Sequence, residues 1–412
     1  MKKSGRATLI STALAAVVLA GCGEPPVKTP EAASTSLFLR TAQGVSVIEP
    51  GAGEPSYTGR NSVPSRDWST VVKAQYTKQG TVVTSFDPSS GAEHWSHTVP
   101  GEDLRVKIVS DAGDVVAMGP QAERLYQFGR RNTSLTIVRG NSTEVQEIKL
   151  EGNYEPEAFS TDGQSLFVVK YLPARAPTKY QVRRLDLNTE TVEGVYTPHE
   201  ELQRAMGGTA RIQAGSPDGD RLYTLYTLGR GANSYAFIHV LSLDKLWAHC
   251  IDLPSEFAQA AESATALTVS PDGNRLYVAN AAAGILAEID TEALTVERTT
   301  PMDFGKGRNT HASSDSDSKL FFASGNQVTS VDAKGLTKTD SWLLEARVTG
   351  LQESADLTEL YVGLDEDVAV LDPETGTTVD TIDPPGVNRI NQLGPEPPPL
   401  EEIVSKDLTC AC

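Results

Sequence analysis

The sequence is poor in cysteine, with only Cys22, Cys250, Cys410 and Cys412 in 412 residues. Once Cys22 is assigned to a lipid anchor, as argued below, an odd number remains, so at least one thiol is unpaired within a monomer. The fold therefore does not depend on the dense disulfide framework of small secreted domains. Three alternatives stay open: a disulfide from Cys250 to one of the last two cysteines, a local disulfide between those two, or a soft-metal site that also uses His249.

Long hydrophobic runs are also scarce. The apolar stretch at residues 7–20 is too short to span a bilayer comfortably and follows Lys2, Lys3 and Arg6, which is typical of a signal peptide. Its end, Leu19-Ala20-Gly21-Cys22, resembles the lipobox of bacterial lipoproteins. That resemblance implies cleavage before Cys22 and a lipid anchor on this residue, with more than one acyl chain for stable attachment.

These features predict four parts of the chain. We expect a lipoprotein signal peptide at residues 1–21, a Pro-rich tether at 22–35, a folded domain at 36–393, and a Pro-rich linker with a cysteine-bearing tail at 394–412. The location that follows is extracytoplasmic, with the lipid holding the protein on the cell membrane or the outer membrane of a bacterium.

Positive charge is in short supply. Lys and Arg number 36 against 54 Asp and Glu, which gives a net charge of −18. Such a chain repels phosphate backbones, so we expect no nucleic-acid partner.

Several catalytic motifs are missing from the sequence. It has no C-x-x-C-H for haem attachment, no P-loop, no H-E-x-x-H and no G-x-S-x-G. We therefore predict no cofactor apart from the lipid on Cys22, and we expect binding rather than catalysis.

What the sequence does contain is a repeat, clearest at residues 264–298. Strands are expected at 266–269, 275–279, 285–289 and 294–298, with a tight turn at Ser270-Pro271-Asp272-Gly273. Eight hairpins of related sequence follow one another at a mean spacing of roughly 46 residues, which is the length of a four-stranded propeller blade.

The repeat predicts an all-β fold, a β-propeller of four-stranded antiparallel blades. The count favours eight blades, with seven as the alternative. The strand-like run at 385–393 is expected to fill the innermost place of the first blade, so that strands from both chain ends close the ring and remove free sheet edges.

The unit at 270–297 resembles the YVTN-type, or YncE-like, β-propeller repeat, in which S-P-D-G is followed by L-Y-V-x-N. The resemblance implies a secreted or surface propeller, usually of seven blades, and no single activity. The hairpin at 87–95 looks like the tryptophan-docking motif of quinoprotein propellers. Only this unit carries the tryptophan, Trp95, so we expect it to pack between blades rather than to mark a quinone enzyme.

The innermost strands of a propeller line a central channel. Residues about seven positions before each turn Asp are expected to face that channel, and they are rich in arginine: Arg60, Arg105, Glu155, Arg211, Arg347 and Arg389. Guanidinium groups bind carboxylates and phosphates in a bidentate manner, which favours a small anionic ligand. The alternative is that Glu155 and Glu157 pair with these side chains as ties between blades.

Three functions remain. The leading hypothesis is a membrane-anchored binding or protein-interaction module, with an envelope protein or a small anionic molecule as partner. The first alternative is a hydrolase or lyase at the channel mouth that acts on an anionic small molecule, with His311 as the candidate base. The second alternative is thiol or metal handling by Cys410 and Cys412.

Overall fold

The computed structural model describes residues 36–42, 44–101, 104–120, 129–197, 205–228, 234–259, 264–305, 307, 310–387 and 389–394. The predicted signal peptide, tether and all of the tail but Gly394 lie outside these residues. Within the described part, no helix is long and apolar enough to cross a membrane.

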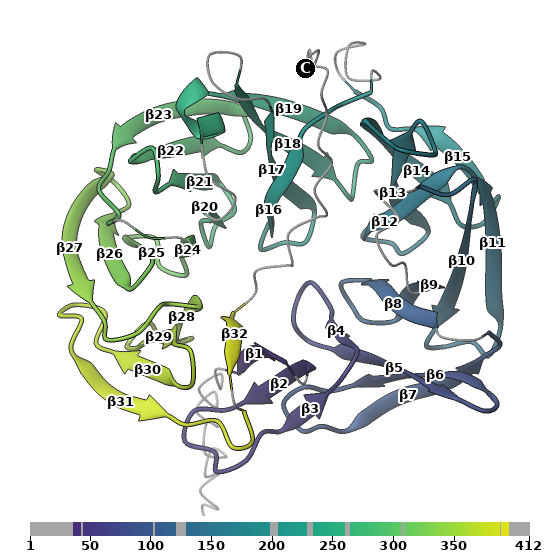
Figure 1. Ribbon diagram of the computed structural model, residues 1–412, viewed down its shortest axis with the longest axis horizontal. Coiled ribbons are helices and arrows are strands. Elements are labelled where there is room, and N and C mark those ends of the chain that lie inside the picture. The colour runs from purple at the N-terminus through teal and green to yellow at the C-terminus, as the bar shows by residue number, and fades with distance from the viewer. Residues whose placement is uncertain are drawn as a thin grey trace, which may run out of the picture. The chain divides into compact units, whose positions relative to one another are not determined.

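The described residues form eight four-stranded antiparallel sheets, arranged as blades around a centre (Figure 1). The first four blades contain the following strands: blade 1, β1 (Leu37–Thr41), β2 (Gly44–Ile48), β3 (Tyr57–Gly59) and β32 (Ile390–Leu393); blade 2, β4 (Ser62–Pro64), β5 (Val71–Thr77), β6 (Gly80–Phe86) and β7 (Glu93–Val99); blade 3, β8 (Leu104–Val109), β9 (Val115–Pro120), β10 (Asn132–Arg139) and β11 (Val145–Glu151); blade 4, β12 (Asn153–Phe159), β13 (Ser165–Leu172), β14 (Lys179–Asp186) and β15 (Thr191–Gly194).

The remaining blades follow the same order from the centre outward. They contain these strands: blade 5, β16 (Thr209–Gly215), β17 (Arg221–Leu228), β18 (Tyr235–Ser242) and β19 (Ala248–Leu253); blade 6, β20 (Thr265–Val269), β21 (Arg275–Asn280), β22 (Ile285–Asp290) and β23 (Thr295–Pro301); blade 7, β24 (Thr310–Ser313), β25 (Lys319–Ser324), β26 (Gln327–Asp332) and β27 (Thr337–Leu343); blade 8, β28 (Gly350–Glu353), β29 (Leu360–Gly363), β30 (Val368–Leu371) and β31 (Thr378–Ile382). A short 3-10 helix, η3 (Ser255–Gln259), follows blade 5. The prediction of an eight-bladed propeller is confirmed, and the alternative of seven blades is wrong.

Blade 1 closes the ring as the sequence predicts. Its innermost strand, β32, comes from the end of the chain and pairs antiparallel with β1, with Leu39 opposite Leu393. The Leu393 amide also donates to the Thr349 carbonyl at 3.1 Å, which links blade 1 to the start of blade 8. The end of the chain thereby supplies the fourth strand of blade 1 and pairs the inner side of β1.

The Ser-x-Asp turn between first and second strands explains why the repeat is regular. In blade 6 the Ser270 hydroxyl donates to Asp272 at 2.6 Å and accepts the Arg275 amide at 2.9 Å, while Gly273 has a positive φ of 74°. The serine therefore satisfies backbone groups that the tight turn leaves unpaired. Equivalent pairs of bonds hold the turns that begin at Ser65, Ser160, Ser216 and Ser354. At Ser110 the hydroxyl also accepts an amide five residues on, but it donates to Asp114, four residues on.

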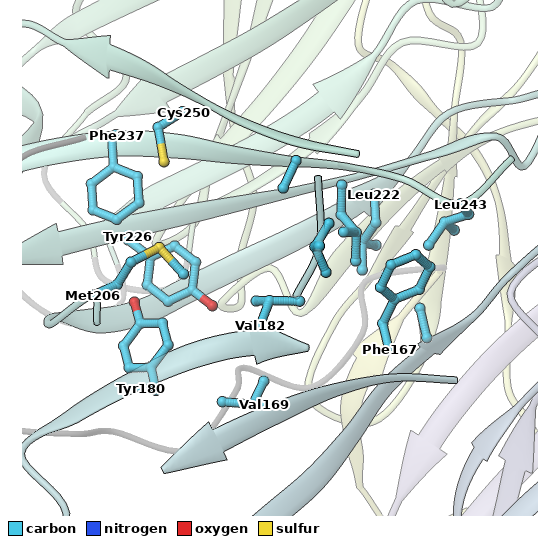
Figure 2. Close-up of a cluster of buried hydrophobic side chains, with 14 of the residues drawn as sticks. Phe167, Val169, Tyr180, Val182, Met206, Leu222, Tyr226, Phe237, Leu243 and Cys250 are labelled. Carbon is cyan, nitrogen blue, oxygen red and sulfur yellow. The ribbon is translucent and has the colours of Figure 1, made fainter. Parts of the chain in front are cut away.

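The hydrophobic core lies between neighbouring blades. In β21 every residue after Arg275 is buried, whereas the outer strand β23 alternates exposed and half-buried residues. Middle strands are thus covered on both faces and outer strands on one. Figure 2 shows the cluster between blades 4 and 5, where the Tyr226 ring stacks on Tyr180 at 5.3 Å and on Phe237 at 5.2 Å.

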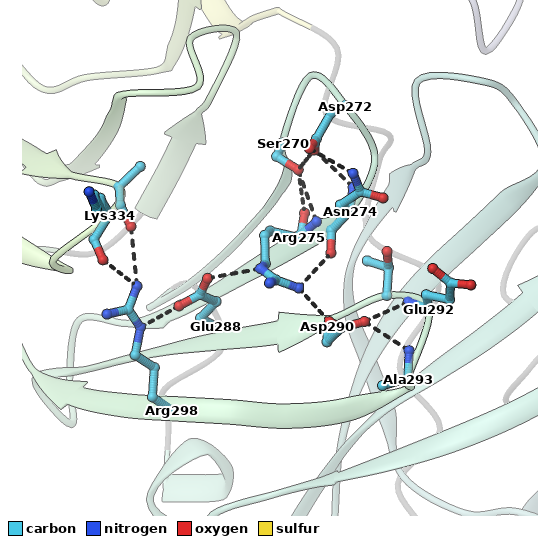
Figure 3. A network of polar contacts seen from close by, with 12 residues as sticks. Ser270, Asp272, Asn274, Arg275, Glu288, Asp290, Glu292, Ala293, Arg298 and Lys334 are labelled. Carbon is cyan, nitrogen blue, oxygen red and sulfur yellow. Dashed lines mark hydrogen bonds and ion pairs between the residues drawn. The ribbon is translucent and has the colours of Figure 1, made fainter.

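Polar ties accompany the apolar contacts between blades. In Figure 3 the buried Glu288 carboxylate lies between the guanidinium groups of Arg275 and Arg298, and Arg298 continues to the Lys334 carbonyl of blade 7 at 2.7 Å. Trp95 has a related packing role, because Gly140 of blade 3 lies so close to its indole that a Cβ there would approach Nε1 to 2.5 Å.

The two ends of the ring differ in their loops. One end, which we call the turn rim, carries the Ser-x-Asp turns. The other end, the hairpin rim, carries the loops between second and third strands and the links between blades. Residues 173–178 of blade 4 and 229–234 of blade 5 lengthen two such loops, as the sequence predicts, although 229–233 lie outside the described residues.

Candidate functional site

The predicted channel residues lie in different surroundings. Arg60 and Arg389 are exposed at the hairpin rim, next to β4 and β32. Arg347 precedes β28 and pairs with Asp365 at 3.0 Å. Arg105 is half-buried on β8. Arg211 lies on β16, and its side chain is not among those that the structure describes.

Glu155 is the member of the predicted set around which basic residues gather. It lies on β12, the innermost strand of blade 4, and its carboxylate contacts Arg130 Nη2 at 2.8 Å and Lys107 Nζ at 3.6 Å. Both cations come from blade 3. Glu155 therefore ties blade 4 to blade 3, but its partners Lys107 and Arg130 are not among the predicted channel arginines.

Bulges in the innermost strands change the predicted register. Register shifts in β8, β12 and β16 leave Lys107, Glu157 and Arg211 without a cross-strand partner. A bulge adds one residue and turns the following side chains. A fixed offset from the turn Asp therefore cannot select the same face in every blade.

Arg130 is held in place by several contacts. Its Nε donates to Thr133 Oγ1 at 2.9 Å, and its Nη2 also donates to the Tyr154 carbonyl. The Arg130 amide donates to the Ala174 carbonyl at 3.0 Å, so the end of the β9–β10 loop is bonded to the loop between β13 and β14. Two neighbouring blades thereby build one continuous surface.

Further cations flank this contact. Arg131 and Arg175 directly follow the two bonded residues, and both are exposed. Lys170 Nζ lies 5.5 Å from the centre of the Tyr154 ring, a cation–π contact. We call Lys107, Arg130, Arg131, Lys170 and Arg175 the basic rim.

The hairpin rim of blade 8, on the opposite side of the ring in Figure 1, has the opposite charge. Asp365, Glu366 and Asp367 lie between β29 and β30, and exposed Asp383 follows β31. Desolvation, and then the charges of Asp383 and Glu366, raise the pKa of Asp367. The hairpin rim therefore has a basic side and an acidic side.

At the turn rim, Arg66 of blade 2 contacts both the neighbouring blade 3 and the more distant blade 5. Its Nη2 donates to Asp111 Oδ2 of blade 3 at 2.6 Å and to the Gly219 carbonyl of blade 5 at 2.8 Å. Arg66 belongs to blade 2, so its side chain reaches across one end of the channel. The sequence analysis does not predict a role for Arg66. The available signal is that this turn reads Ser-Arg-Asp, whereas the turns of blades 5 and 6 read Ser-Pro-Asp.

A buried carboxylate also lies near the turn rim. Glu353 of β28 accepts hydrogen bonds from Ser313 Oγ at 3.1 Å and from the Asp315 amide at 2.8 Å. Burial, with a smaller contribution from the Asp315 charge, raises the pKa of Glu353 to about 7. Protonation of Glu353 therefore depends on its burial beside Asp315.

His311 and Cys250, the predicted candidates for catalysis and for metal or disulfide chemistry that the structure describes, are both buried in the blades. His311 is 8% exposed on β24, opposite Ala323. Cys250 is 8% exposed on β19, while Cys22, Cys410 and Cys412 are outside the described residues. Within the described ranges, no three His, Cys, Asp or Glu side chains are arranged to hold a metal ion.

A small cavity lies between blades 4 and 5. Its volume is about 20 Å³, and its lining includes Arg183, Met206 and His239. Burial and the neighbouring His249 lower the pKa of His239 to about 4, so this imidazole is neutral at pH 7. The space suffices for a water molecule and not for an organic ligand.

These blades and their closure define the chain as a β-propeller, a fold that commonly serves as a binding or interaction module. Comparison with protein-family models finds no match, and neither does a search of curated proteins.

Solved structures are similar to the chain in fold. One is the dihydro-heme d1 dehydrogenase NirN in complex with DHE, at 14% identity and a TM-score of 0.55, covering 87% of this chain and 74% of that one. Another is AztD of Citrobacter koseri, at 14% identity and a TM-score of 0.54, covering 86% of this chain and 96% of that one. Likeness at this identity establishes the architecture alone.

Proposed function

We propose that the protein is a membrane-anchored, extracytoplasmic binding module and that the basic rim is its binding face. One observation carries the proposal: the bond from the Arg130 amide to the Ala174 carbonyl joins loops of two blades and collects cations in a chain of net charge −18. Propellers bind through surfaces of this kind because rigid blades position the loops.

The anchoring part of the proposal rests on the sequence. Leu19-Ala20-Gly21-Cys22 resembles a lipobox, and the lipid on Cys22 would keep the propeller at an envelope surface. Membership of the YVTN-type repeat family is part of the same proposal, supported by the Ser270-Pro271-Asp272-Gly273 turn and the strand that follows it.

Crosslinking in cells tests this function. The full-length protein is crosslinked and purified, and bound proteins are identified by mass spectrometry, with Cys22→Ala as the unanchored control. We expect a reproducible envelope partner that is lost or strongly reduced in the control. An identical set of captured proteins with and without Cys22 would contradict anchoring, and the absence of any specific partner would contradict a protein-interaction role.

A further inference from the structure

We propose that the basic rim binds a soluble ligand that carries at least two phosphate or carboxylate groups. This inference rests on the proposed function, since it takes the basic rim as the binding face and names the chemistry of what it holds.

The charge balance of the basic rim favours an anion. The basic rim has five cationic side chains, and Glu155 pairs with two of them, Lys107 and Arg130. The nearest further acids along the chain are Glu157, which is buried on the same strand β12, and Glu151, which is exposed at the end of β11. The protein as a whole has a net charge of −18, so its composition does not account for this positive cluster.

The placement of the cations indicates a ligand with more than one anionic group. Lys107 lies on an innermost strand, Arg131 is the last residue of the β9–β10 loop, and Arg175 lies in the loop between β13 and β14. A single carboxylate contacts one or two of these positions. Two or more anionic groups engage both loops, and each guanidinium forms paired hydrogen bonds to a phosphate or carboxylate.

The site is held in shape before a ligand arrives. Arg130 is fixed by Thr133, Tyr154 and Glu155, and the Lys170 ammonium is seated on the Tyr154 ring. Groups that are already ordered lose little conformational entropy on binding. Arg131 and Arg175 are exposed and provide the contacts that the ligand adds.

A discrete ligand fits this rim better than an anionic bilayer does. A flat membrane surface laid on the hairpin rim would also meet the acidic side, where Asp365, Glu366 and Asp367 lie. Like charges would repel there. A molecule confined to blades 3 and 4 avoids that cost.

Calorimetry on the full-length protein in neutral detergent tests the inference, with tripolyphosphate and citrate as probes. We expect both to bind, and we expect Arg131→Ala with Arg175→Ala to weaken binding by at least about tenfold, since each lost charged hydrogen bond is worth roughly that factor. The matched control is Lys245→Ala with Lys334→Ala, which removes the same charge at two exposed positions at the turn rim of blades 5 and 7 and should change affinity less than about twofold.

Each other result overturns the inference. Equal weakening in the control pair would mean that only net charge matters. Absence of binding by both probes, or binding only to vesicles that contain phosphatidylglycerol, would also contradict a soluble polyanion. If the Arg131 and Arg175 variant still crosslinks its envelope partner while neither probe binds the wild type, the anion site fails and the interaction module stands.

Discussion

Blades 4 and 8 lie across the ring from each other and share one plan, yet their hairpin rims differ. In blade 4, β13 and β14 have eight residues each, and in blade 8, β29 and β30 have four. The longer strands of blade 4 extend its hairpin, which bears Lys170 and Arg175, whereas the short hairpin of blade 8 bears Asp365, Glu366 and Asp367.

The turn rims of the same two blades are alike. Ser160 and Ser354 make the same pair of bonds to an Asp two residues on and to an amide five residues on. The comparison teaches that the turn rim preserves the fold, while the hairpin rim varies in length and charge and so provides specificity.

The largest expected effect is a loss of stability when a side chain is removed from the hydrophobic core between the blades. Phe167 of blade 4 is fully buried, and Phe167→Ala should lower the free energy of unfolding by about 3–5 kcal/mol because it leaves a cavity between blades. Urea unfolding measures the change. Thr178→Ala, in the exposed loop of the same blade, is the control and should leave stability unchanged; a large loss there would mean that the long hairpin supports the fold.

Blades 4 and 8 each contain a buried glutamate whose pKa is raised. Burial brings the pKa of Glu157 and of Glu353 to about 7, from 4.5 in the unfolded chain. Between these values the unfolded state loses its proton first, so stability should fall as pH rises from about 4.5 to 7.

Replacement by glutamine tests this pH dependence. Glu157→Gln and Glu353→Gln should each remove part of the decline between pH 5 and pH 8, on the order of 1–3 kcal/mol, as measured by unfolding at each pH. A decline that is the same in both variants as in the wild type would show that other groups cause it.

Glu155, the acid that pairs with two members of the basic rim, allows anion binding and stability to be tested in one variant. Glu155→Gln removes one negative charge next to Lys107 and Arg130, so the affinity for tripolyphosphate should rise by about three- to tenfold. Stability should fall by about 1 kcal/mol, because a tie between blades is weakened. Asp365→Asn, which removes the partner of Arg347 on the acidic side, should leave the affinity unchanged.

The shared turn predicts equal and modest effects. Ser160→Ala and Ser354→Ala should each cost about 1 kcal/mol, since each removes one hydroxyl that satisfies a turn amide. Thermal unfolding of both variants checks this. A cost in one blade alone would break the equivalence of their turn rims.

The smallest effect concerns the predicted channel arginines. Arg60→Ala and Arg389→Ala change exposed residues at the hairpin rim outside blades 3 and 4. We expect each to change tripolyphosphate affinity by less than about twofold. A strong loss in calorimetry would return the anion site to the channel mouth.

Much of the architecture follows from the sequence because it is local and repeated. The turn at Ser270 fixes its own geometry, and the strands expected at 275–279 and 285–289 correspond to β21 (Arg275–Asn280) and β22 (Ile285–Asp290). Closure of the ring by the end of the chain follows from the unpaired first unit. Each of these inferences needs only a short stretch and a spacing.

The candidate site does not follow in the same way. Its members come from β8, from the residues before β10, and from the β13–β14 hairpin, and they meet only after blades 3 and 4 pack. The spacing argument finds Glu155 but not its partners, since the bulge at Lys107 is not encoded by spacing. The extended loop at 173–178 is the available sequence signal, because long propeller loops often bind partners.

Site-specific photocrosslinking in cells compares the two sides of the hairpin rim directly. A photoreactive amino acid is placed at Thr178, beside the basic rim, or at Glu366, on the acidic side, in the otherwise unchanged lipoprotein. The account predicts a specific crosslinked partner from position 178 and none from position 366. The same partner from both positions, or from position 366 alone, would contradict a binding face on blades 3 and 4.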